Sequence, residues 1–318
     1  MKNIIRNTGI SFLLALLLPG CEAQNEIETI TILKPFEKTP EYYENLRAYK
    51  GSDHQLAFGW FGNWTAKGAT MASRLATAPD SMDIISIWGQ WNELTPEQYA
   101  DKEFVQKVKG TKVIFTTFAH TVPEIFGNTE EGIKKYAYAL ADSVAKYGYD
   151  GLDLDYEPNY GGSGPLCQKN NMEIFVRALS ENLGPKSGSG RLLCIDGEPY
   201  YLNEGLAELF DYGIVQSYSS SGDSDLQGRF NRAYAIGWKP EQYIFTENFE
   251  SLWRTGGTTN FTDSKGNRMP SLIGMARFQP TQGQKAGVGT YHMEYEYAHE
   301  PDYKFMRMAI QTMNPAVE

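Results

Sequence analysis

Residues 130–157, EEGIKKYAYALADSVAKYGYDGLDLDYE, combine an amphipathic helix pattern with a strand pattern and leave only a short turn between them. Thr129 can cap the helix and Gly148 can end it. From residue 151 onward, acidic and apolar side chains alternate, as they do on the two faces of a β-strand. In the helical part, apolar residues recur three or four positions apart, which indicates one buried face: Ile133, Tyr136, Ala137, Leu140, Val144 and Ala145. The segment therefore predicts one helix–strand unit of an α/β fold.

The same alternation of short apolar runs and helical patterns extends along most of the chain. Strands that alternate with helices are typical of parallel sheets with crossover connections. Eight such units in roughly 250 residues fit a (β/α)8 TIM barrel. A doubly wound sheet is the alternative, but it usually has fewer strands, and the sequence contains no GxGxxG loop. The eight runs that we interpret as strands are residues 55–60, 83–89, 112–119, 151–157, 191–198, 213–218, 242–248 and 287–295.

Composition limits the classes of partner. The chain has 318 residues, of which 41% are hydrophobic, so it can bury a large core. Its formal net charge is -10, and it has no basic run. An acidic chain of this kind is a poor partner for nucleic acid or for an anionic membrane surface. We expect one barrel domain over residues 51–318 that acts as a monomer.

The N-terminus has the features of an export signal. Lys2 and Arg6 precede the apolar run ISFLLALLLPG at residues 10–20, which is too short to span a bilayer comfortably. The run ends in LPGC, and this resembles the signal of a bacterial lipoprotein in which Cys21 becomes the acylated first residue. The alternative is an ordinary secretory signal with an incidental cysteine.

This interpretation divides the chain into a signal peptide (residues 1–20), a polar tether or lead-in (residues 21–50) and the barrel. We expect a lipid-anchored protein of the bacterial cell envelope, held in the outer membrane through Cys21 alone and facing either the periplasm or the cell surface. Two further cysteines, Cys167 and Cys194, could pair in an exported chain. Cys194 lies in an apolar strand-like run and also fits a small buried residue.

The acidic strand is the most informative feature of the sequence. Asp153, Asp155 and Glu157 share one face of the strand, whereas Asp150 has the opposite parity and suits a structural role at the strand start. In a barrel the acidic face would point inward and rise toward the C-terminal mouth, where barrel enzymes carry their catalytic residues. Two other interpretations are a solvated strand edge and a calcium or magnesium site. No CxxC or HExxH motif indicates another metal site, and we expect neither a metal nor a cofactor.

Buried carboxylates spaced about 6–7 Å apart along a strand cannot all ionise comfortably. At least one pKa should rise, and a carboxylic acid that stays protonated near neutral pH can act as a general acid. Glu157 is the natural candidate because it is nearest the mouth and has the longest reach. Asp155 could orient and assist it, with Asp153 one layer below.

The spacing Asp150-Gly-Leu-Asp153-Leu-Asp155-Tyr-Glu157 resembles the DxxDxDxE signature of glycoside hydrolase family 18. The resemblance extends over residues 50–312, although only this strand is diagnostic. It implies substrate-assisted hydrolysis with retention, in which the 2-acetamido group of the sugar is the nucleophile. Glu157 would then be the acid and base, and Asp155 would orient the acetamide.

The same resemblance assigns roles to the sixth strand. Tyr218 would hydrogen-bond the acetamide, and Gln216 would bind sugar from the same face of the strand. The stretch departs from the Met-x-Tyr-Asp pattern of many chitinases, because Gln216 stands in place of Met and Ser219 in place of Asp. The last strand offers Tyr291 where chitinases commonly have tryptophan.

A compact barrel without an added α+β insertion resembles the endo-β-N-acetylglucosaminidases that cut the GlcNAc–GlcNAc core of N-glycans. We therefore expect an N-glycan or another GlcNAc-containing glycan as the substrate. The glycan class (high-mannose, hybrid or complex) stays open. The alternatives are a chitinase or chitooligosaccharide hydrolase and a non-catalytic surface glycan-binding protein. Five residues near strand ends are candidate sugar contacts: Phe61, Trp88, Glu198, Glu247 and Tyr291.

Overall fold

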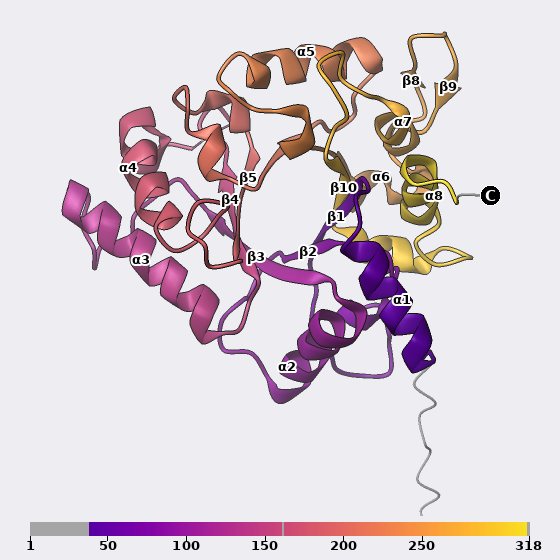
Figure 1. Cartoon of the computed structure of the whole chain (residues 1–318), viewed down its shortest axis with the longest axis horizontal. Coiled ribbons are helices and arrows are strands. Elements are labelled where there is room, and N and C mark those ends of the chain that lie inside the picture. The colour runs from indigo at the N-terminus through magenta and orange to yellow at the C-terminus, as the bar shows by residue number, and fades with distance from the viewer. Residues whose placement is uncertain (1–37, 161, 317–318) are drawn as a thin grey trace, which may run out of the picture. The chain divides into compact units, whose positions relative to one another are not determined.

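Eight parallel strands close into a barrel in the computed structural model of the chain, which describes residues 38–160 and 162–316. Figure 1 looks along this ring of strands, with the helices outside it. The order around the barrel is β1-β10-β7-β6-β5-β4-β3-β2. The fold is thus a (β/α)8 TIM barrel, as predicted, and each of the eight expected runs overlaps one barrel strand: β1 Leu56–Phe61, β2 Ile84–Ile87, β3 Lys112–Phe118, β4 Gly151–Tyr156, β5 Leu192–Gly197, β6 Tyr212–Gln216, β7 Tyr243–Asn248 and β10 Gly287–Tyr291.

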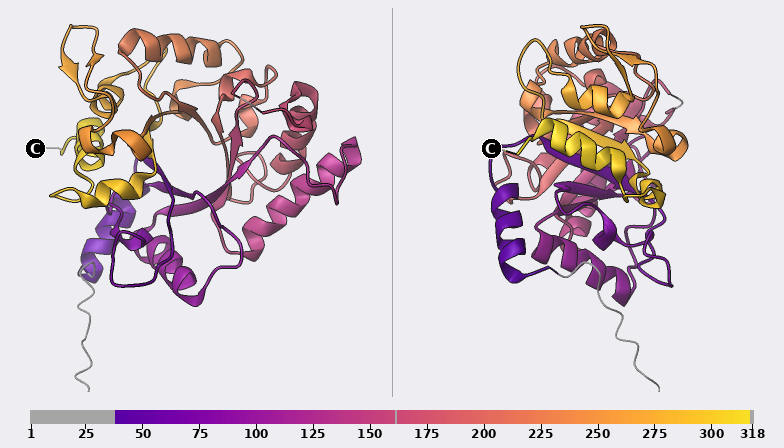
Figure 2. Two further views of the ribbon diagram at one scale, coloured as in Figure 1. Left: turned by 180° about the vertical axis from the view of Figure 1, so that it is seen from behind. Right: turned by 90° about the vertical axis from the view of Figure 1, so that its right-hand side faces the viewer.

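Helices surround the ring of strands in the left view of Figure 2. The α-helices are α1 Pro40–Lys50, α2 Pro96–Glu103, α3 Glu130–Lys146, α4 Lys169–Ser180, α5 Asp223–Tyr234, α6 Phe249–Leu252, α7 Ser271–Arg277 and α8 Lys304–Met313. A π-helical turn, η2 Phe104–Lys109, continues α2. The short 3-10 segments are η1 Leu75–Thr77, η3 Pro165–Cys167, η4 Pro199–Tyr201, η5 Ala207–Leu209, η6 Pro240–Gln242, η7 Trp253–Thr255 and η8 Met293–Ala298. A two-stranded sheet, β8 Phe261–Thr262 with β9 Arg268–Met269, lies in the connection between β7 and β10.

Strand parity separates two hydrophobic regions. Leu152, Leu154 and Tyr156 of β4 are buried in the larger cluster between strands and helices, so the acidic residues of β4 face the barrel interior as predicted. The interior has its own cluster, which includes Phe58, Trp60, Ile84, Ile114, Cys194, Ile214 and Ile244. The strand sequence therefore determines which side chains reach the site.

Residues 40–50 form a helix, although the sequence suggested a tether up to residue 50. Thr39 accepts a hydrogen bond from the Tyr42 amide, and Pro40 occupies the first turn, where a helix tolerates proline. Tyr43 and Leu46 are buried, and Lys50 Nζ donates to Met82 O at 2.7 Å. Pro40 therefore starts a helix that belongs to the compact unit, which extends from Lys38 onward.

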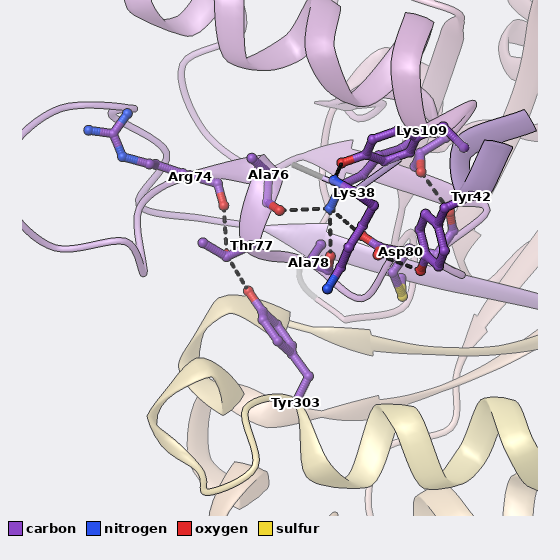
Figure 3. A network of polar contacts seen from close by, with 12 residues as sticks. Lys38, Tyr42, Arg74, Ala76, Thr77, Ala78, Asp80, Lys109 and Tyr303 are labelled. Atoms are coloured by element: carbon purple, nitrogen blue, oxygen red, sulfur yellow. Dashed lines mark hydrogen bonds and ion pairs between the residues drawn. The ribbon is translucent and has the colours of Figure 1, made fainter. Parts of the chain in front are cut away.

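Around α1, a polar network joins the helix to η1 and η2 (Figure 3). The Lys109 ammonium lies 2.7 Å from Asp80 Oδ1 and donates to the carbonyl oxygens of Ala76 and Ala78. The Tyr42 hydroxyl donates to the other oxygen of Asp80 at 2.7 Å. Lys109 is 2% exposed, and an ammonium so deeply buried requires these acceptors.

The signal peptide, Cys21 and residues 21–37 of the expected tether lie outside the described residues. Within the part of the chain that the structure describes, no helix is both long and apolar enough to cross a membrane.

Candidate active site

A pocket of about 200 Å³ opens at the C-terminal ends of the barrel strands. Carboxyl, amide and hydroxyl groups line it together with aromatic rings. Its walls come from β1, β2, β3, β4, β5, β6 and β10, so residues far apart in the sequence meet there. The lining residues are Trp60, Trp88, Phe118, Asp155, Glu157, Asp196, Gln216, Tyr218 and Tyr291.

Asp153 forms the floor beneath this pocket and is fully buried. Its Oδ2 accepts a hydrogen bond from Trp60 Nε1 at 2.8 Å and another from the Thr116 hydroxyl at 3.0 Å. Burial raises the pKa of Asp153 to about 6, while these donors act in the opposite direction by stabilising the ionised form. Asp153 therefore titrates close to neutrality.

Asp155 lies one layer above Asp153 and lines the pocket. Burial, together with the negative charges of Glu157 and Asp153, raises the pKa of Asp155 to about 8. The rise expected for crowded carboxylates is thus found on Asp155. Near neutral pH this residue is a carboxylic acid that can donate a hydrogen bond as well as accept one.

Asp196 is a third buried carboxyl that the sequence analysis missed. It faces inward from β5, pairs in register with Asp155 of β4 and accepts a hydrogen bond from Gln216 Nε2 at 3.0 Å. The available signal was an acid in an otherwise apolar strand, with the same parity as Cys194. A single acid in such a run did not indicate which neighbours barrel closure would give it.

Glu157 follows the last residue of β4 and is held from the β3 side. Its backbone N–H donates to His120 Nε2 at 3.2 Å, which requires that nitrogen to be unprotonated. Just beyond Glu157, the chain is held from the β5 side, where Glu198 accepts hydrogen bonds from Asn159 N at 2.8 Å and Asn159 Nδ2 at 3.1 Å. The candidate acid is therefore fixed by two neighbouring loops.

This geometry corrects the role expected of Glu198. The residue is 2% exposed and also accepts a hydrogen bond from the Tyr200 hydroxyl at 2.9 Å, so its oxygens are engaged away from the pocket. Gly197 turns the chain at φ +84°, where a Cβ would lie 2.6 Å from Tyr156 O. The turn ends the strand alternation, and Glu198 therefore positions a loop instead of lining the pocket.

We expected Glu247 to contact sugar, but it is buried and lies outside the pocket lining. Its carboxyl accepts hydrogen bonds from Ser219 N at 2.9 Å and from the Ser271 hydroxyl. Ser219 follows Tyr218 directly and has φ +56°, a conformation uncommon for residues other than glycine. Glu247 thus stabilises the turn that places Tyr218.

Tyr218 and Gln216, two of the predicted site residues, line the same pocket as Asp155, Glu157 and Asp196. The Tyr218 ring stacks with the ring of Tyr291, with a centroid separation of 6.2 Å. Burial, then the charges of Asp196 and Asp155, raise the pKa of Tyr218 well above its ordinary value. Its hydroxyl therefore keeps its proton and can donate to a substrate oxygen.

Aromatic rings supply the rest of the pocket lining. Trp88 contacts Tyr291 and Phe118 edge-on, each at a centroid separation of 5.4 Å, and Phe118 is 58% exposed. Phe61, which we expected to contact sugar, is fully buried in the cluster between strands and helices. Trp60, one residue earlier, has the inward parity and lines the pocket instead.

The sequence left open a metal site for the acids and a disulfide between Cys167 and Cys194. Across residues 38–160 and 162–316, no group of three or more His, Cys, Asp or Glu side chains is arranged to hold a metal ion. Cys167 and Cys194 are free thiols. Asp150 accepts hydrogen bonds from Val113 N and Gln106 Nε2 at the base of β4, in the structural role expected of it.

Fold and site together define the class: a barrel with the carboxyl, tyrosine and aromatic arrangement of a glycoside hydrolase. The sequence matches the model of glycoside hydrolase family 18, BT1044-like, over residues 22–132 and 124–312. The chain belongs to glycoside hydrolase family 18, which confirms the resemblance predicted from β4.

Individual relatives agree with this assignment. A solved glutamate-to-glutamine variant of BT1044 is 34% identical, covers 87% of this chain and 93% of its own, and superposes with a TM-score of 0.80. Endo-β-N-acetylglucosaminidase F2 of Elizabethkingia meningoseptica is 28% identical over 302 residues, 85% of each chain. The endo-β-N-acetylglucosaminidase of Cordyceps militaris shares the fold, with 24% identity, coverage of 88% of this chain and 97% of its own, and a TM-score of 0.70.

Proposed function

We propose that this protein is an endo-β-N-acetylglucosaminidase that hydrolyses the GlcNAc-β-1,4-GlcNAc core of N-glycans. One observation carries the proposal: Glu157, Asp155, Tyr218 and Gln216 line a single pocket that has an aromatic wall. Similarity to an enzyme with this activity along most of both chains supports it. Several solved chitinases resemble the chain in fold alone, at 10–16% identity.

The arrangement suits a reaction in which the substrate supplies its own nucleophile. Glu157 would protonate the glycosidic oxygen as the C1–O bond breaks, while the acetamide carbonyl oxygen of the same sugar bonds to C1. Glu157 would then take a proton from water as that water attacks C1 and releases the acetamide. Two displacements at C1 retain the anomeric configuration.

Asp155 and Tyr218 would act on the acetamide. Asp155, with its pKa near 8, would accept a hydrogen bond from the acetamide N–H and, in its ionised form, supply a counter-charge as the group becomes cationic. The protonated Tyr218 hydroxyl would donate to the carbonyl oxygen and hold it beneath C1. Asp153 lies below Asp155 and limits the charge that Asp155 can carry.

Mass spectrometry tests the proposal directly. Residues 38–318 would be incubated with a panel of high-mannose, hybrid and complex N-glycoproteins and with chitopentaose, beside Glu157→Gln. We expect glycoproteins to keep one GlcNAc, and we expect kcat to fall by about 10²–10⁴-fold in the variant while glycan binding persists. Cleavage of chitopentaose alone would favour the chitinase. Glycan binding without cleavage of any substrate would identify a binding protein.

We also propose that the protein is exported and anchored through an acylated Cys21, on the strength of the LPGC sequence at residues 18–21. Metabolic labelling with radioactive palmitate should mark the full-length chain but not Cys21→Ser. Labelling that survives the substitution would refute the anchor.

A further inference from the structure

Asp196 is a buried acid for which the proposed mechanism has no role. It is 1% exposed, faces inward from β5 and lies in register with Asp155 on β4. One of its oxygens, Oδ1, accepts the hydrogen bond from Gln216 Nε2. An isolated ionised carboxylate at such a depth would be costly, so its protonation state has to be explained.

The other oxygen of Asp196 points to the explanation. The side chains of Asp196 and Asp153 contact each other. Both Asp196 Oδ2 and Asp153 Oδ1 are buried, and neither receives a hydrogen bond from another group in the part of the chain that the structure describes. Two ionised carboxylates in contact, each with a buried oxygen that lacks a donor, would repel each other, whereas one proton shared between the two carboxyl groups satisfies both.

We propose that Asp196 is a neutral carboxylic acid that positions the site: its Oδ2–H donates to Asp153, and its Oδ1 accepts from Gln216. This inference rests on the proposed function for its catalytic meaning, but the proton assignment is independent of turnover. Asp196 touches no reacting atom in this scheme and acts through its two neighbours.

The proton belongs on Asp196 because the two acids have different partners. Asp153 receives hydrogen bonds from Trp60 and Thr116 on Oδ2, and these favour its ionised form. Asp196 receives one hydrogen bond, from the Gln216 amide, and its other neighbours include acids. Burial, followed by the charges of Asp153 and Asp155, raises its pKa well above the ordinary value.

Groups from each neighbouring element lead to the same assignment. Those that face or adjoin Asp196 are Asp153 and Asp155 of β4, Glu157 beyond it, Cys194 of its own strand and Tyr218 beyond β6. None is a cation that would favour an ionised Asp196.

The consequence for the site is a fixed orientation of Gln216. Its Nε2 is committed to Asp196, so Oε1 is the amide atom left to accept a hydrogen bond from a substrate N–H or O–H. The proton given to Asp153 also lets that residue ionise without facing a second bare carboxylate. Asp196 thus determines which amide atom of Gln216 is left for the substrate, and it allows Asp153 to be ionised.

Asparagine at position 196 gives a sharp test, because its amide can donate to Asp153 and accept from Gln216 as the neutral acid does. We expect Asp196→Ala to lower kcat by about tenfold, which is what the loss of one hydrogen bond to a positioning group typically costs. Asp196→Asn should recover most of that loss and keep the alkaline limb of the kcat/KM profile in place. If kcat of Asp196→Asn is no higher than that of Asp196→Ala, or if Asp196→Asn moves the alkaline limb to lower pH, Asp196 is ionised and the proposal fails. Asp211→Asn, at the base of β6, is the matched control.

Infrared spectroscopy decides the question without turnover. At pH 9, above the pKa of about 8 for Asp155, the wild type should still show a carboxylic-acid C=O band that is absent from Asp196→Asn. Absence of this band from the wild type would overturn the assignment. If the band is present but no substrate is cleaved, the proton assignment stands and the proposed function fails.

Discussion

Glu198→Gln tests how strongly the position of Glu157 depends on the loop that follows it. Glu198 Oε2 accepts the backbone N–H of Asn159 at 2.8 Å, and Oε1 accepts Asn159 Nδ2 and the Tyr200 hydroxyl. Glutamine can keep the Oε1 bonds but places an NH2 group against the backbone N–H. The variant therefore loses one hydrogen bond to a carboxylate while the shape of the side chain is kept.

A hydrogen bond to a charged group contributes about 1.5–3 kcal/mol. Asn159 is exposed, and water can replace part of the lost interaction, so we take the lower end of that range. A cost of about 1.4 kcal/mol in holding Glu157 productively corresponds to a tenfold fall in rate. At about 2 °C per kcal/mol for a domain of this size, Tm should fall by no more than about 3 °C.

Steady-state kinetics on a glycopeptide and thermal unfolding give the two readouts. We expect kcat of Glu198→Gln to fall about tenfold with KM nearly constant, because the substrate pocket is not altered. Glu173→Gln is the control. Glu173 also accepts a hydrogen bond from an asparagine side chain, Asn203 Nδ2 at 2.7 Å, but it lies in helix α4, outside the pocket. Unchanged kcat in Glu198→Gln, or an equal loss in Glu173→Gln, would refute the reasoning.

Three further predictions concern burial, protonation and the network around α1. Phe61→Ala should destabilise the protein by about 3–5 kcal/mol in urea unfolding without changing glycan affinity, whereas Phe118→Ala should weaken binding with little change in Tm. Asp155 has a folded pKa of about 8 against an ordinary value of 3.8, so the folded state holds a proton that the unfolded chain releases. Unfolding free energy should therefore decline from pH 4 to pH 9 more steeply in the wild type than in Asp155→Asn; parallel curves would contradict this. Asp80→Ala should cost about 3 kcal/mol because it removes the carboxylate partner of the buried Lys109, with kcat unaltered; an unchanged stability would show that the ion pair contributes nothing.

Much of the barrel was predictable because its signals are local. Parallel strands covered by helices form short apolar runs, and all eight of these runs overlap barrel strands. The capped helix at Thr129 begins where the sequence predicts it. The period of two in a strand also sufficed to turn Asp153 and Asp155 inward.

The features of the site that the sequence did not predict depend on contacts between distant segments. Asp196 is one acid in an apolar run until closure of the barrel brings it beside Asp155. The expectation for Glu198 assumed that alternation continues past the strand, but the left-handed turn at Gly197 ends it. Phe61 and Trp60 are adjacent aromatic residues, and only the register of β1 decides that Trp60 faces inward.

The layering of the barrel interior has an evolutionary consequence. The lower part of the interior is filled mainly by apolar side chains, whereas the part toward the mouth holds three crowded acids, Asp153, Asp155 and Asp196. Replacing buried charged groups with well-packed apolar ones often stabilises a protein. Selection for stability alone would therefore favour loss of the acids and would produce a more stable barrel without catalysis. The acids can persist only where selection acts on the chemistry that they perform.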